Sequence, residues 1–317
     1  MKPFLTFSEQ IEKLVVEKKL LVSDPDFATE KLMQIGYFAL IGGYKTPFRN
    51  PYTKEFLPGT SIEDIVALYE LDEELREIFL KYILQIERRV RSLLSYYFTE
   101  KYGVDQREYL NPNHYRVPKP IPYSELQRLL QVLSELAEQS TVYPFINYQR
   151  QAYGNVPLWV LVNALSFGSL SKLYSFLPDQ IQSQISKNFC SANRKQFGQF
   201  LHFITKFRNV CAHGERLYCY KTRCMIPDTP MHQKLRLQRE KGTYTACKQD
   251  LFALVIALYY LLPQKSFCKF YESLSRALKS YLFQSGPISE YNLNNMMGFP
   301  ENWNAIYLEA NESRAAP

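Results

Sequence analysis

Three residues near position 210 carry side chains that can act together on a phosphate ester. Arg208, Asn209 and His213 belong to the run Arg208-Asn209-Val210-Cys211-Ala212-His213, which closes an apolar, helix-like segment. Arginine is a permanent cation that binds phosphate oxygens, and an imidazole can accept or donate a proton near neutral pH. These three residue types can therefore hold a phosphate and move a proton without a metal ion.

The spacing of the three residues fits one end of a helix. Residues four apart share a helix face, so Asn209 and His213 are within hydrogen-bonding reach, whereas Arg208 is turned by about 140° from His213. Gly214 predicts that the helix ends directly after His213. The alternative is that both cations merely suit the negative end of the helix dipole.

A basic segment follows this helix. Residues 216–241 contain seven Lys and Arg against two acidic residues, with tyrosines among them. Cations that hold a nucleic-acid backbone and rings that stack on bases are typical of contacts to single-stranded RNA. Arg216, Tyr218, Lys221 and Arg223 are therefore predicted to bind RNA, with an ordinary solvated loop as the alternative.

A second charged group lies on a long predicted helix. Arg88, Arg89 and Arg91 are predicted to line an RNA channel, or alternatively to form a solvated helix face. Glu87 precedes them and is expected to support the site by pairing with Arg208. Its alternative role is an ion pair with Arg91, four residues further along the same helix.

Composition sets the class of protein. The chain has 317 residues, of which 46% are hydrophobic and 22% charged, and its net charge is +7. It is long enough for a substantial core, and it contains no apolar run of about 18 residues that would cross a membrane. The first residues lack the pattern of a signal peptide, which predicts a cytoplasmic protein. The six cysteines show no metal-ligand spacing, so neither a metal nor a cofactor is expected.

Hydrophobic periodicity predicts an all-α fold, a helical bundle with an extra N-terminal helical section and a basic loop or small hairpin after the motif helix. The expected divisions are an N-terminal section over 1–60, a helical domain over 61–283 and a tail over 284–317. Within the domain, a Pro-rich linker occupies 104–122 and the basic loop 215–246. Trp159 and Phe167 are expected in the core rather than as stacking platforms. Helices are predicted over 7–19, 26–42, 62–101, 123–139, 157–165, 169–176, 178–189, 193–213, 246–262 and 266–283.

Short sequence motifs, which occur in order along most of the chain, resemble those of the Abi_2 group of abortive-infection proteins (AbiD/AbiF-like). The shared phrases include Gly36-Tyr37-Phe38, Gly43-Tyr44, Leu68-Tyr69-Glu70-Leu71-Asp72, Ile86-Glu87-Arg88-Arg89-Val90-Arg91, Pro157-Leu158-Trp159, Ser166-Phe167-Gly168-Ser169-Leu170, Phe207-Arg208-Asn209-Val210-Cys211-Ala212-His213, Arg216-Leu217-Tyr218 and Met297-Gly298-Phe299-Pro300. The Arg208–His213 run is similar to the R-x4-6-H motif of HEPN ribonucleases. Arg107 and His114 also fit that loose form, but they lie in a predicted loop.

The resemblance implies a HEPN-type helical domain in a bacterial anti-phage or toxin-like system. It implies a metal-independent endoribonuclease that cleaves RNA through attack of the 2′-OH, with Arg208, Asn209 and His213 as catalytic residues. It also implies a homodimer with a composite site, and RNA as substrate or as a small regulatory partner. The alternatives are a non-catalytic RNA-binding module and a phage-sensing interaction protein, and no membrane partner is expected.

Overall fold

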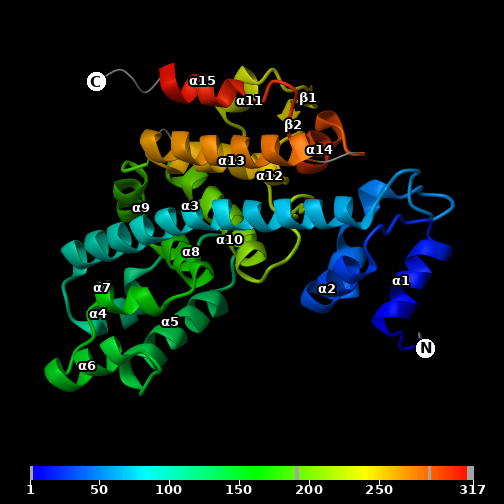
Figure 1. Cartoon of the computed structure of the whole chain (residues 1–317). Helices are drawn as coiled ribbons and strands as arrows, with labels where there is room; N and C mark the ends of the chain where they lie inside the picture. Colours follow the sequence, from blue (N-terminus) through cyan, green and yellow to red (C-terminus); the bar gives the residue numbers. More distant parts are fainter. Residues whose placement is uncertain (1–2, 190–192, 285–286, 313–317) are drawn as a thin grey trace.

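One helix of 41 residues, α3 (Ile62–Tyr102), runs through the middle of the molecule (Figure 1). The computed structural model describes residues 3–189, 193–284 and 287–312. The Ser61 hydroxyl accepts the Asp64 N–H at 3.3 Å, and the Asp64 carboxylate accepts the Ser61 N–H at 2.8 Å, which caps the start of α3. Gly103, with φ +95°, ends it. The predicted helix over 62–101 is thus confirmed, and it extends about 60 Å.

The N-terminal section packs against the first half of α3. It contains α1 (Phe7–Val16) and α2 (Pro25–Ile35), followed by a π-helical turn at Phe38–Gly42. The single helix predicted over 26–42 is wrong at its second half, because Gly36 adopts φ +87° and ends α2. Beyond the break, the Tyr44 ring meets the Tyr69 ring of α3 edge-on, with centroids 5.3 Å apart.

A group of shorter helices covers the second half of α3 (Figure 1). Most of the helices predicted here are confirmed, whereas α4 and α6 were not expected. Phe167 is buried as predicted, but Trp159 is 47% exposed, so its expected place in the core is wrong. The group consists of α4 (Gln106–Leu110), α5 (Tyr123–Glu138), α6 (Pro144–Tyr153), α7 (Leu158–Leu161), α8 (Phe167–Phe176) and α9 (Asp179–Ser186).

Three further helices complete the core around α3: α10 (Arg194–Ala212), α12 (Leu251–Leu261) and α13 (Gln264–Gln284). Both α10 and α13 pack directly on α3, and Phe79 of α3 meets Phe270 of α13 with ring centroids 5.0 Å apart. Every residue of α12 is buried, which is typical of a helix enclosed on all sides.

The connection from α10 to α12 contains α11 (Pro230–Lys234) and a two-stranded antiparallel hairpin of β1 (Arg239–Glu240) and β2 (Thr243–Tyr244). The hairpin confirms the small strand pair considered for this segment. The C-terminal part forms α14 (Glu290–Met297) and α15 (Ala305–Glu312), which periodicity had not indicated. The all-α bundle is confirmed, while the proposed division at residues 60 and 283 stays a prediction.

Candidate functional site

The Arg208–His213 run lies at the C-terminal end of α10. Asn193 caps the start of this helix with its carboxamide, and His213 is the C-cap residue. Gly214 has φ +67°, its N–H points to the Cys211 carbonyl at 3.4 Å, and the Glu215 N–H donates to the Val210 carbonyl at 3.0 Å. These two bonds form a Schellman motif. The predicted role of Gly214 is confirmed, and His213 is held at a defined helix end.

The three motif side chains differ in exposure. Asn209 and His213 are exposed, and the His213 N–H donates to the Asn209 carbonyl at 2.9 Å. The Arg208 side chain is 30% exposed and turns toward α3. Cys211 lies between them but is buried, and burial raises the pKa of its thiol to about 12. The groups at this end that can reach a ligand are therefore the imidazole, the carboxamide and the guanidinium, and not the thiol.

Glu87 of α3 contacts both arginines that the sequence offered as its partners. The carboxylate is 1% exposed; Oε1 accepts from Nη2 of Arg91, and Oε2 lies 3.6 Å from Nε of Arg208. Arg91 also donates to the Leu165 carbonyl at 2.9 Å, which ties the segment before α8 to this cluster. The structure therefore brings Glu87, Arg91 and Arg208 together, and both predicted contacts of Glu87 are present, while its support of a site stays a prediction.

This cluster has unfilled hydrogen-bonding capacity. Glu87 Oε2, Arg91 Nε and Arg208 Nε are buried atoms without a hydrogen-bond partner in the described part of the chain. Buried polar groups in folded proteins are nearly always satisfied. Here Glu87 Oε2 and Arg208 Nε face each other as an ion pair at 3.6 Å, just beyond hydrogen-bonding distance, whereas Arg91 Nε has no partner among the described residues. One carboxylate also faces two guanidinium groups, which leaves an excess of positive charge beside the exposed end of α10.

A second buried carboxylate, Asp72 of α3, fixes the chain that follows His213. Its oxygens accept the backbone N–H groups of Leu217 at 3.0 Å and Tyr218 at 2.6 Å, and the hydroxyl of Tyr44 at 2.7 Å. Arg76, one turn further along α3, donates to the same carboxylate at 2.8 Å. Burial raises the pKa of Asp72, and these four donors oppose that shift.

Arg76 extends this second cluster toward the motif, because its Nη1 also reaches the Glu215 carbonyl at 3.4 Å. Tyr44, Asp72 and Arg76 therefore hold residues 215–218 directly after the end of α10. Sequence analysis did not single out Asp72 or Arg76, although their i,i+4 spacing was a signal that could have found them.

Tyr218 is not placed to stack on RNA, which corrects its predicted role. Its side chain is 2% exposed and its ring stacks on that of Tyr44, with centroids 5.7 Å apart. The ring belongs to the core that supports the loop, so a base cannot reach it in this conformation.

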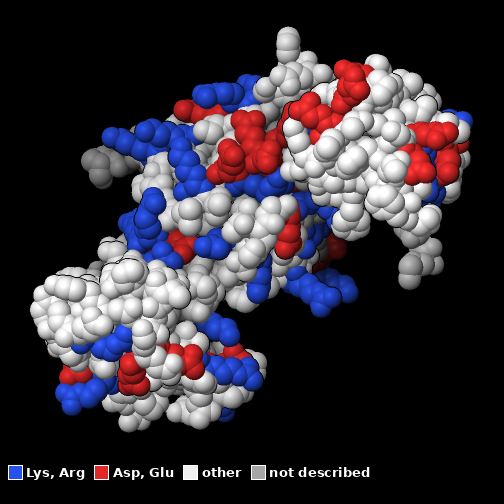
Figure 2. Space-filling view, turned by 60° about the horizontal axis from the view of Figure 1, so that its bottom comes forward, with Lys and Arg blue, Asp and Glu red and all other residues white. Residues whose placement is uncertain are grey.

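The other residues predicted to bind RNA differ in accessibility. Arg88, Arg216, Lys221 and Arg223 are exposed, whereas Arg91 is partly buried at Glu87. Arg89 is also partly buried, because its guanidinium donates to the Asn188 carbonyl and lies over the Phe189 ring. Figure 2 shows Lys and Arg side chains gathered across the middle of one face, between the two ends of the molecule.

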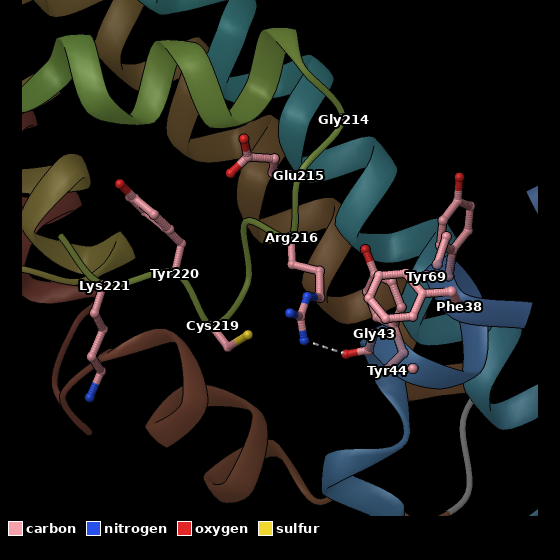
Figure 3. Close-up of a pocket in the computed structure, with 12 residues that line it drawn as sticks. Phe38, Gly43, Tyr44, Tyr69, Gly214, Glu215, Arg216, Cys219, Tyr220 and Lys221 are labelled. Atoms are coloured by element: carbon pink, nitrogen blue, oxygen red, sulfur yellow. Dashed lines mark hydrogen bonds between the residues drawn. The ribbon is translucent and has the colours of Figure 1, made fainter. Parts of the chain in front are cut away.

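A hollow of about 450 Å³ opens beside Gly214, between the N-terminal section and the loop after α10 (Figure 3). Arg216 lies in its wall and donates to the Gly43 carbonyl at 3.0 Å. A Cβ at Gly43 would lie 3.3 Å from the Arg216 side chain, so the absence of a side chain there permits this close approach. Phe38 and Tyr69 stand on one side of the hollow, with Tyr220 and Lys221 on the other (Figure 3).

No group of three or more His, Cys, Asp and Glu side chains among the described residues is arranged to hold a metal ion. Within the same residues, no helix is both long and apolar enough to cross a membrane. The second R-x4-6-H match, Arg107 and His114, is held by structural contacts. The His114 ring stacks on that of Tyr102 with centroids 3.9 Å apart, and Arg107 forms an ion pair with Asp105.

Comparison with known proteins gives one positive result. A family model described as Abi-like protein, Abi_2, matches residues 30–219. The matched region includes Tyr44, Asp72, Glu87 and the whole Arg208–His213 run, and it ends before the phrase at 297–300. No curated protein and no solved structure matches the chain.

Proposed function

The chain belongs to the Abi-like protein family, which indicates a role in abortive infection, and we propose that within this role it is a metal-independent HEPN-type endoribonuclease. The observation that carries the proposal is the end of α10. An exposed imidazole lies there five residues after a guanidinium that a buried carboxylate holds without saturating it. Because the Arg208 side chain is 30% exposed, its guanidinium is accessible to a phosphate.

The proposed reaction uses the nucleophile that RNA itself carries. His213 takes the proton of the 2′-OH, the 2′ oxygen attacks the adjacent phosphorus, and the 5′ oxygen leaves with a proton. The products are a 2′,3′-cyclic phosphate and a 5′-hydroxyl. Arg208 offsets the negative charge that develops on the phosphate oxygens, through a charge-assisted contact. Asn209 orients His213 or donates to a phosphate oxygen.

Glu87 is proposed as a positioning residue in this scheme. Its carboxylate holds the guanidinium of Arg208 from the protein side, while the remaining N–H groups of Arg208 face the substrate. Because Arg91 shares the same carboxylate, Glu87 does not fully cancel the positive charge of Arg208. Arg88, Arg216, Lys221 and Arg223 are proposed to bind the RNA backbone, whereas the buried Tyr218 is not.

Cleavage in a chelator tests the proposal. A mixed RNA pool is incubated in EDTA with the wild type, with His213→Ala and with His202→Ala as the matched control, since His202 is an exposed histidine on the same helix. The wild type and His202→Ala are expected to cut and to leave cyclic-phosphate ends, whereas His213→Ala does not. Equal cutting by all three would contradict the proposed site. RNA binding without cleavage by any of them would favour a non-catalytic RNA-binding module.

A second copy of the chain is proposed to complete the site, since HEPN sites of this type combine two R-x4-6-H elements. The His213 of one subunit then acts as base and that of the other as acid. The mass in solution, measured by light scattering, is expected to be that of a dimer. Adding excess His213→Ala protein to a fixed amount of wild type is expected to lower the cleavage rate, because most wild-type subunits then belong to mixed dimers that lack one histidine. A fully active monomer would contradict this arrangement.

A further inference from the structure

A groove beside the Glu87 cluster has features of a binding site that the proposed reaction leaves unused. It is a hollow of about 330 Å³ between α3 and α7, lined among others by Arg88, Arg91, Ser92, Ser95, Trp159 and Asn163; we refer to it as the Trp159 groove. A second hollow, of about 520 Å³, continues it along α3, with Ser92, Ser95 and Trp159 common to both. The combined space is within the range of small-molecule and nucleotide sites.

The indole of Trp159 is unusually accessible. It is 47% exposed, whereas Trp303, the other tryptophan of the chain, is 6% exposed. The short helix α7 that carries Trp159 is anchored by the buried side chains of Leu158 and Leu161. The Asn163 carboxamide donates to the Trp159 carbonyl at 2.8 Å, which fixes the end of that turn. The groove therefore presents a large flat ring from a firmly held backbone.

The groove is linked to the proposed catalytic residues through the side chains of Arg91 and Glu87. Arg91, in its wall, bonds to Glu87, and Glu87 contacts Arg208. Glu87 and Arg91 are separated by one turn of α3, so the groove begins within one helical turn of the carboxylate that positions Arg208.

The two ends of the groove carry opposite charges. Arg88, at the end nearer Glu87, is exposed and makes no ion pair within the described residues. Glu100, in the second hollow, accepts the hydroxyl of Tyr96 at 3.2 Å. A phosphate is therefore favoured at the Arg88 end and an uncharged, planar group further along, beside Trp159.

We propose that the Trp159 groove holds an unpaired nucleobase of the RNA, one or two nucleotides from the cleaved phosphate. The base stacks on the indole and the adjoining phosphate contacts Arg88. Base–aromatic stacking is tolerant of sequence because every base has a π face, so the groove gives affinity and register rather than strict specificity. This inference rests on the proposed function, because it names a substrate subsite beside Arg208.

Tryptophan fluorescence tests the inference without relying on cleavage. Trp159 becomes the only tryptophan in a His213→Ala, Trp303→Phe protein, which is titrated with a single-stranded RNA oligonucleotide. Stacking is expected to quench the emission in a saturable manner. If Trp303→Phe fails to fold, the comparison of His213→Ala with and without Trp159→Phe isolates the signal of Trp159 by difference. RNA that binds without changing this emission would overturn the inference.

Affinity gives a second measurement on the His213→Ala background. Trp159→Ala is expected to weaken RNA binding about 10- to 100-fold in an anisotropy titration, and Trp159→Phe to restore most of it. Tyr148→Ala is the matched control, an exposed ring on α6 that lies outside the groove, and it is expected to bind as tightly as its parent. Equal affinity of Trp159→Ala and its parent would overturn the inference.

The two proposals fail separately. Quenching and a Trp159-dependent affinity in a protein that never cuts RNA would support the groove and contradict the nuclease. Cleavage that depends on His213 but not on Trp159 would support the nuclease and contradict the groove. A protein that binds no RNA in either assay would contradict both.

Discussion

Two buried carboxylates on α3, Asp72 and Glu87, each precede an arginine by four residues, yet their surroundings differ. Asp72 accepts hydrogen bonds from Arg76, from the Tyr44 hydroxyl and from two backbone N–H groups. Glu87 bonds to Arg91 and contacts Arg208 at 3.6 Å, and its Oε2 atom has no hydrogen-bond partner among the described residues. The same local pattern thus produces one saturated cluster and one unsaturated cluster.

The difference separates a structural role from a functional one. A saturated buried network stabilises one arrangement of the chain, and losing any member is costly. A network in which one carboxylate faces two guanidinium groups keeps positive charge available for a ligand, which is a common property of functional sites. On this account, the Asp72 cluster holds the loop after His213 in place, and the Glu87 cluster presents Arg208 to RNA. Four predictions test this distinction.

The largest expected effect is on stability, in Asp72→Ala. This substitution leaves Arg76 buried without its carboxylate and two backbone N–H groups without an acceptor. We expect a loss of about 3–5 kcal/mol in the free energy of unfolding, measured by denaturant titration. Glu73→Ala, at the neighbouring exposed position of α3, is the control and should change stability by less than about 0.5 kcal/mol. A similar small effect at Asp72 would mean that the two clusters do not differ as described.

Glu87→Gln is expected to affect activity more than folding. The amide keeps the volume but loses the charge that holds Arg208, so RNA cleavage should fall about 10- to 100-fold while the free energy of unfolding changes by about 1–2 kcal/mol. Initial cleavage rates and denaturant titration of the same preparation measure the two effects. Glu77→Gln, an exposed residue of the same helix, serves as control. A large loss of stability with normal cleavage activity would mean that Glu87, like Asp72, stabilises the fold and does not serve the reaction.

A third carboxylate, that of the partly buried Asp250, sharpens the comparison because its side chain caps a helix, accepting the Ala253 N–H at 3.0 Å. Burial raises its pKa to about 6 from 3.8. The folded state then binds the proton more tightly than the unfolded state. The stabilising effect is complete below pH 3.8 and is lost as the pH rises to about 6.

We therefore expect the free energy of unfolding to fall, as the pH rises from 4 to 7, by an amount on the order of 1–3 kcal/mol relative to Asp250→Asn. The asparagine keeps the helix cap but does not titrate. The difference between the two proteins, followed by denaturant titration at each pH, isolates this residue. A difference that does not vary with pH would show that Asp250 has an ordinary pKa.

The smallest expected effect is that of Tyr44→Phe. It removes one of four donors to Asp72 and leaves the ring contacts with Tyr69 and Tyr218 in place. We expect a loss of about 1 kcal/mol in the free energy of unfolding, by denaturant titration, with Tyr52→Phe at an exposed position as control. An effect as large as that of Asp72→Ala would mean that Tyr44, rather than the carboxylate, organises the cluster.

Local features of the sequence were sufficient for the long helices and for the end of α10. Ser61 and Asp64 form the capping box that begins α3, and Gly214 supplies the positive φ that ends the motif helix. Each of these depends on residues within a few positions of one another. The i,i+4 pairing of Glu87 with Arg91 was accessible for the same reason.

Contacts between distant residues were not accessible. Asp72 is paired with backbone N–H groups 145 and 146 residues away, so nothing near it in the sequence indicates these two partners, in contrast to Arg76 at i+4. Tyr218 lies in a basic, polar segment, and only the packing of Tyr44 reveals that it is buried. Trp159 shows the opposite error, since a large aromatic residue beside apolar neighbours predicts burial, whereas the structure leaves it exposed.

The central claim is that the unsaturated cluster beside His213 serves cleavage of RNA through its own 2′-OH. The most direct test is an RNA oligonucleotide with a mapped cleavage position, compared in EDTA with the same oligonucleotide carrying a single 2′-deoxy sugar immediately 5′ of the cleaved phosphate. The account predicts that cleavage at that bond disappears while other bonds are still cut. Continued cleavage at the 2′-deoxy position would contradict it.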